Sequence, residues 1–146
     1  MSYIRISNES FFDKEYYSTF AKQNEYRFFN VGSSISTLVP KYKELIKEAI
    51  GNKANETFKD YELPPIDTSA IKNIFERELE IILEKINLSL ENDEPVNKVI
   101  EWKGVEYLLN LSLTNPNNRI ASDYYDIISI CKECLAKNKS MYLSIQ

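Results

Sequence analysis

Residues 67–90 constrain the fold most, because their apolar side chains recur at the three- and four-residue spacing of an α-helix. The apolar positions are Ile71, Ile74, Phe75, Leu79, Ile81, Ile82, Leu83 and Ile86. At the helical angle per residue they span an arc of about 200°, wider than a surface helix needs. We therefore expect a central helix, contacted from more than one side, with Asp67-Thr68-Ser69 as its N-cap and its end near Leu90.

Three further segments have helical patterns. Residues 10–23 begin with a Ser10/Asp13 cap, 40–50 begin with a proline and end at Gly51, and 119–138 carry one apolar face. Residues 2–7 fit a strand or an extended arm, 26–32 fit a strand or the lead-in to a turn at Gly32, and 140–146 fit a short terminal strand. The polar stretch 52–66, which ends in Pro64-Pro65, is expected to be a loop.

Residues 95–113 fit two structures. As a helix they show two opposed apolar stripes, and as strands they alternate from Val105 to Leu113 with Lys103-Gly104 as a two-residue hairpin turn. The clean helix that follows favours the helical interpretation. We thus expect one mainly α domain over residues 1–146, a compact bundle of about five helices with short terminal strands. The alternative is an α+β fold with a hairpin at 96–113.

In the helical interpretation, residues 95–137 resemble one HEAT-type helical hairpin. The turn Asn115-Pro116-Asn117-Asn118 leads into a second helix that begins Arg119-Ile120-Ala121. The resemblance implies two packed antiparallel helices and no particular function.

The composition excludes most familiar catalytic machinery. The chain has no histidine, and its three glycines, Gly32, Gly51 and Gly104, are far apart. Histidine-based nucleophile systems and glycine-rich phosphate loops are therefore excluded. Cys131 and Cys134 form a C-x-x-C inside an amphipathic segment without a second ligand pair, so we expect buried, reduced, metal-free thiols. The sequence predicts no catalytic residue, no metal and no cofactor, and hence no enzyme.

Negative charge is concentrated in the middle of the chain. The net charge is −4, whereas residues 56–106 alone carry thirteen acidic and six basic residues. The acidic positions of interest are Glu76, Glu80 and Glu84 at helical spacing, followed by Glu91, Asp93 and Glu94. Two interpretations stay open, a solvated face or a recognition surface for a basic partner. The partner-binding prediction rests on the second and names these six residues.

Glu78 is the one charge within the apolar arc. A carboxylate in apolar surroundings needs a partner. Three explanations are open: a tertiary cation or tyrosine, with Arg5, Arg27 and Arg119 as candidates; a shallow position that reaches water; or a cation from another chain.

Partners and compartment follow from charge and length. The net negative charge argues against nucleic acid, and no apolar run approaches the roughly 20 residues of a membrane span. Asp and Glu occur early at the N-terminus, without a targeting signal, so we expect a cytoplasmic protein.

In size, acidity, lack of catalytic residues and richness in Asn, Lys, Ile and Tyr, the chain resembles the small immunity proteins of bacterial contact-dependent and other polymorphic toxin systems. The resemblance implies an inhibitor that binds a cognate toxin, often a basic nuclease, in a tight heterodimer. The main alternative is a regulatory or adaptor protein that binds another protein through residues 95–137. An acidic nucleic-acid mimic and a small enzyme are the remaining alternatives.

Overall fold

The computed structural model describes residues 3–10, 28–32, 38–54, 59–86, 96–111 and 116–145. Within these ranges the chain forms three α-helices and six strands in two antiparallel sheets, which is an α+β fold. The expected bundle of about five helices is wrong, because parts of the segments expected as a helix (95–113) and as a loop (52–66) form strands, whereas the short terminal strands are confirmed. The predicted helix at 10–23 lies outside the described residues.

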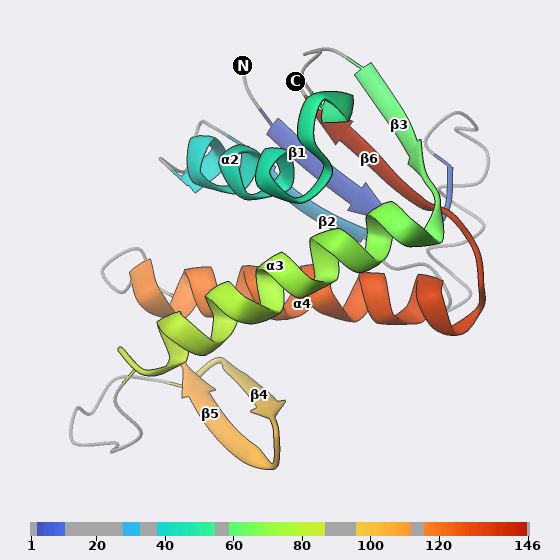
Figure 1. The fold of residues 1–146 in the computed structure, drawn as a ribbon. Helices are drawn as coiled ribbons and strands as arrows, with labels where there is room; N and C mark the ends of the chain where they lie inside the picture. The colour runs from blue at the N-terminus through green and yellow to red at the C-terminus, as the bar shows by residue number, and fades with distance from the viewer. Residues whose placement is uncertain are drawn as a thin grey trace.

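A four-stranded sheet contains both ends of the described chain (Figure 1). Its order is β2-β1-β6-β3, and the strands are β1 (Tyr3–Ser7), β2 (Phe28–Gly32), β3 (Lys59–Leu63) and β6 (Met141–Ile145). In the central pair, Ile4 lies opposite Ile145 and Ile6 lies opposite Leu143. These side chains alternate along their strands and are buried in the core that the helices share. The two short terminal segments thus form the centre of the sheet.

The loop expected at 52–66 is largely structured. Helix α2 (Leu38–Ile50) ends as predicted at Gly51, whose φ of +62° is the left-handed conformation typical of a C-cap glycine. A 3₁₀ turn, η1 (Gly51–Ala54), follows directly, and strand β3 lies within the second half of the same stretch. The sequence prediction missed β3 because a five-residue edge strand of mainly polar residues has no local apolar pattern.

Helix α3 (Pro65–Leu83) begins and ends earlier than predicted. Pro64 occupies the N-cap position and Pro65 the first helical position, where a missing N–H costs nothing. Thr68 of the expected cap lies in the first turn, and its hydroxyl donates to the Pro64 carbonyl at 3.2 Å. Ile81, expected within the apolar arc, has 47% of its surface exposed. The arc that α3 buries is therefore narrower than the sequence indicated.

Helix α4 (Pro116–Ala136) is the central helix. It packs along α3 on one side and contacts β1, β2 and β6 on another (Figure 1). Eleven residues of α4 are buried, compared with seven residues of α3. They include Ile127, Ile128 and both cysteines, so its predicted apolar face is confirmed. The helix expected at 67–90 is contacted from more than one side, since α3 packs on both α2 and α4, but α4 contacts more elements than α3 does.

Residues 98–109 form a β-hairpin, so the helical interpretation of 95–113 is wrong. Strands β4 (Lys98–Trp102) and β5 (Val105–Leu109) pair with Lys98 opposite Leu109 and Trp102 opposite Val105. Lys103 and Gly104 form the turn with φ of +51° and +82°, the left-handed pair that a two-residue hairpin requires. The expected HEAT-like pair of helices is therefore absent from this region. Figure 1 shows the hairpin on the side of α4 away from the large sheet.

Candidate functional site

The three predicted acidic residues of α3 differ in their partners. Lys72, one turn earlier on the same helix, forms an ion pair with Glu76. Lys103, from the hairpin turn, forms an ion pair with Glu80. Glu84 is exposed and forms no ion pair with any described residue. Two of the three carboxylates therefore already have an intramolecular cation.

The contact between Glu80 and Lys103 also affects their protonation. The hydrogen bond from the Lys103 ammonium lowers the pKa of Glu80, and the same contact raises the pKa of Lys103. Both side chains are exposed, so water and salt screen the pair. The main structural effect of this ion pair is to join the tip of the hairpin to α3. The Lys103 ammonium also offsets the negative charge of Glu80 on the predicted acidic face of α3.

The other three predicted partner-binding residues, Glu91, Asp93 and Glu94, lie outside the described residues. Their part in the predicted acidic surface stays a prediction.

Glu78 has a cation that the sequence analysis did not consider. Its side chain is 21% exposed and accepts a hydrogen bond from the neighbouring Arg77 at 3.0 Å. Arg77 Nε also donates to Glu78 at 3.3 Å, and the two terminal nitrogens of the guanidinium donate to Glu48 of α2 at 2.9 and 3.1 Å. Consecutive helical residues point in different directions. The arginine side chain is nevertheless long enough to reach the neighbouring Glu78. Because its guanidinium also binds Glu48, it joins α2 to α3.

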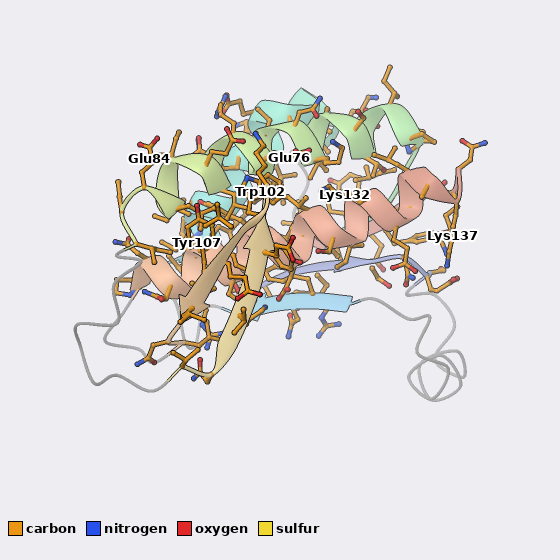
Figure 2. All side chains as sticks on the ribbon, turned by 90° about the horizontal axis from the view of Figure 1, so that it is seen from below. Glu76, Glu84, Trp102, Tyr107, Lys132 and Lys137 are labelled. Carbon is orange, nitrogen blue, oxygen red and sulfur yellow. The ribbon has the colours of Figure 1, made fainter. Side chains whose placement is uncertain are left out.

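The inner side of the hairpin contacts α3 and α4. Trp102 is 7% exposed and lies close to Lys132 in Figure 2. The Lys132 ammonium is 4.9 Å from the centre of the indole ring, within cation–π range. The indole N–H is buried without a well-aligned acceptor in the described part of the chain, but it lies near enough to Glu80 to help lower the pKa of that carboxyl. Trp102 therefore fills the junction of three elements.

Lys98 makes a second connection between the hairpin and α4. Its ammonium donates to the Ser122 hydroxyl at 2.6 Å and to both Asp126 carboxylate oxygens at 2.9 Å. With Lys103 bound to Glu80, both lysines of the hairpin are paired with helix residues. Neither is therefore available to a carboxylate on the outer side of the hairpin.

The outer side of the hairpin combines exposed apolar groups with unpaired charge. Val99 lies opposite Leu108, and Glu101 lies opposite Glu106. Val99 is 53% exposed, and both glutamates are exposed. Neither glutamate forms an ion pair with any residue that the structure describes. Like charges directly across a strand pair destabilise it, so this face has an electrostatic cost that the free protein does not relieve.

Exposed apolar residues are concentrated in the same region. The described chain has five large apolar residues that are exposed, and three of them, Val96, Val99 and Val105, lie on or next to the hairpin, with Val99 on its outer side and Val105 on the side of Trp102. This surface could not be predicted under the helical interpretation of 95–113, because a helix would separate Glu101 from Glu106 instead of pairing them. The signal that could have found it is Gly104, which is unfavourable within a helix and favourable in a hairpin turn.

A buried polar pair lies deeper in the molecule. The Tyr42 hydroxyl donates to Asp123 Oδ2 at 2.6 Å, and both residues are buried. Burial raises the pKa of Asp123 to about 6, although the Tyr42 hydrogen bond and the positive charge of Arg119 oppose this. Burial likewise raises the pKa of Tyr42 above its usual range. The pair joins α2 to α4 inside the core and is inaccessible to a large ligand.

The two cysteines are free and buried, as predicted. The Cys131 thiol lies 3.6 Å from the Met141 sulfur, and burial raises the pKa of both thiols, that of Cys134 to about 11. A thiol with a raised pKa is a poor nucleophile. Their position favours a role in packing.

The described ranges contain no group of three or more Cys, Asp or Glu side chains that could hold a metal ion. None of the described helices has the length and apolar character needed to span a bilayer.

The candidate functional site is the outer face of the hairpin, where β4 and β5 present exposed apolar groups beside unpaired acidic groups. No family model, curated protein or solved structure that was compared with the chain matches it.

Proposed function

We propose that this chain is a protein-binding inhibitor of the immunity type, which neutralises a basic toxin domain in a heterodimer and acts in the cytoplasm. The observation that supports this most is the outer face of the hairpin, where Glu101 and Glu106 oppose each other beside exposed Val99. A partner that supplies positive charge and apolar contact would relieve both unfavourable features at once.

The arrangement of the hairpin suits such a surface. Its inner side is fixed by Trp102 and Lys98, so the outer side is presented on a rigid support. A preorganised surface loses less conformational entropy on binding than a loop does. Exposed carboxylates also raise the association rate with a basic protein, most strongly at low ionic strength.

The alternative function, a regulatory or adaptor protein, depended on a pair of helices at 95–137. Since 98–109 form strands, that surface does not exist in the expected form. The acidic surface predicted on α3 is also reduced, because Glu76 and Glu80 are paired within the molecule. Both findings favour the hairpin, in place of α3 or a pair of helices, as the proposed interface.

The proposal is tested by co-expressing the full chain with the toxin domain encoded by the adjoining gene and measuring growth. We expect the chain to restore growth and to co-purify with the toxin as a one-to-one complex. Failure to restore growth while both proteins are expressed and folded would contradict the proposal. A stable complex that leaves the toxin active would indicate an adaptor instead of an inhibitor.

A further inference from the structure

We infer that Glu101 and Glu106 together bind a single arginine or lysine side chain presented by an extended segment of a protein partner, whose apolar residues cover Val99 and Leu108. The inference rests on the proposed function for the presence of a protein partner. It goes further in naming the residues and the chemistry of recognition.

The register of the hairpin brings the two carboxylates together. The two-residue turn makes Trp102 and Val105 the hydrogen-bonded pair that closes the hairpin. Glu101 and Glu106 are then a non-hydrogen-bonded pair, in which the Cα atoms are about 4.5 Å apart and the side chains approach most closely. Two carboxylates at this spacing can both accept hydrogen bonds from one guanidinium or ammonium group.

The neighbouring pair on the same face determines the rest of the occupant. Val99 and Leu108 lie two residues from the glutamates on their respective strands, so they share the same side of the sheet. A segment that covers both pairs needs an apolar side chain about one strand repeat away from its cation. An extended strand, whose side chains on one face recur every second residue, supplies this spacing.

Charge excludes the other occupants of such a face. A second copy of this chain would place two more glutamates against the first two, and nucleic acid would add phosphates. A metal ion would find only two carboxylates here, and the described residues contain no group of three or more Cys, Asp or Glu side chains that could hold one. The basic side chains nearest in sequence, Lys98 and Lys103, are bound to Asp126 and Glu80. A cation from another protein is the occupant that remains.

The experiment uses a ten-residue synthetic peptide of alternating arginine and valine, with a glutamine–valine peptide as the uncharged control. Each is titrated at low salt into the isotope-labelled full chain, and amide chemical shifts are followed by NMR. We expect the arginine peptide to shift the amides of residues 98–109 and the glutamine peptide to shift none of them. No shift at the hairpin, or equal shifts over α2, α3 and the hairpin, would overturn the inference.

Two double variants with the same change in net charge make the test specific. Glu101→Gln/Glu106→Gln should weaken peptide binding about tenfold, as expected for two exposed charge contacts. The control Glu44→Gln/Glu62→Gln removes two exposed carboxylates from α2 and β3, neither of which forms an ion pair with a described residue. It should leave binding within twofold. An equal loss in both variants would show that only net charge matters and would overturn the inference.

The same variants separate this inference from the proposed function. If the arginine peptide binds the hairpin but the chain does not neutralise the toxin, the inference stands and the proposed function fails. If Glu101→Gln/Glu106→Gln neutralises and binds the toxin as tightly as the unchanged chain, the proposed function stands and the inference fails.

Discussion

Two sets of glutamates, one on α3 and one on the hairpin, look alike in the sequence and differ in the structure. On α3, Glu76 and Glu80 each have a lysine partner from the same chain. On the hairpin, Glu101 and Glu106 face each other, and no ion pair joins either to a described residue. The first set contributes to the fold, and the second repels itself.

The difference shows that the number of carboxylates is a poor guide to a recognition surface. What matters is whether the molecule neutralises them itself. The α3 pairs place a cation of the hairpin or of the helix beside each glutamate, whereas the lysines of β4 and the turn are directed to the helices. An uncompensated charge is stable only on a surface that water or a partner can reach.

The largest expected effect concerns the inner side of the hairpin. Trp102→Ala should lower the free energy of unfolding by about 3 kcal/mol, because it leaves a large cavity among the hairpin, α3 and α4. Val99→Ala, on the outer side of the same strand, should cost less than about 0.5 kcal/mol, because the side chain is already half exposed. Denaturant titration measures both. Equal losses of unfolding free energy would show that the inner side of the hairpin is not buried and the outer side exposed as we describe.

Asp123 extends the comparison to a buried carboxylate. Its pKa of about 6 in the folded protein lies above the value of 3.8 expected when unfolded, so the folded state binds the proton more tightly. The contribution of this group to stability should therefore rise as pH falls from about 6 to about 4, by on the order of 2 kcal/mol. Above pH 6 it should be constant.

This pH effect is isolated by subtracting the unfolding free energy of Asp123→Asn, which retains an oxygen to accept the Tyr42 hydrogen bond and cannot ionise. As the pH falls, the free energy of unfolding of the unchanged chain should rise relative to that of Asp123→Asn. A difference independent of pH between 4 and 7 would show that Asp123 has an ordinary pKa.

Lys98 should have a smaller effect on the hairpin than Trp102. Lys98→Met removes the hydrogen bonds to Ser122 and Asp126 while keeping the length of the side chain. We expect a loss of about 1 kcal/mol, since the pair is partly exposed. Lys47→Met, on the exposed face of α2 without an ion pair to the described residues, is the matched control and should be near zero. If both substitutions have the same small effect, Lys98 does not hold the hairpin against α4.

The helices could be predicted from the sequence because their signals are local. The apolar spacing in α2 and α4 and the glycine after α2 identified these elements, including the buried cysteines. The large sheet could not be derived in this way. Its central strands, β1 and β6, lie at opposite ends of the chain, and their pairing depends on contacts that no window of sequence contains.

The site was missed for a related reason. Residues 95–113 carry helical and alternating apolar patterns at once, so periodicity did not decide between them. The deciding feature is the left-handed conformation of Lys103 and Gly104, which the glycine permits. With the hairpin misassigned, Glu101 and Glu106 were counted only as part of an acidic region. The partner of Glu80 could not be identified from local sequence either, since Lys103 is distant in sequence from α3, whereas Lys72, the partner of Glu76, lies only one helical turn away.

The central claim is that the chain neutralises the glutamates of α3 and leaves those of the hairpin to repel each other. The most direct test is the sign of a small stability change in two single variants at low salt. Glu106→Gln should raise the free energy of unfolding by a few tenths of a kcal/mol, because it removes repulsion from Glu101. Glu80→Gln should lower it, because it leaves Lys103 without its partner. Both changes should shrink at high salt. A decrease for Glu106→Gln would show that the hairpin glutamates are compensated, and an increase for Glu80→Gln would show that Glu80 is not stabilised by Lys103; either result would contradict this account.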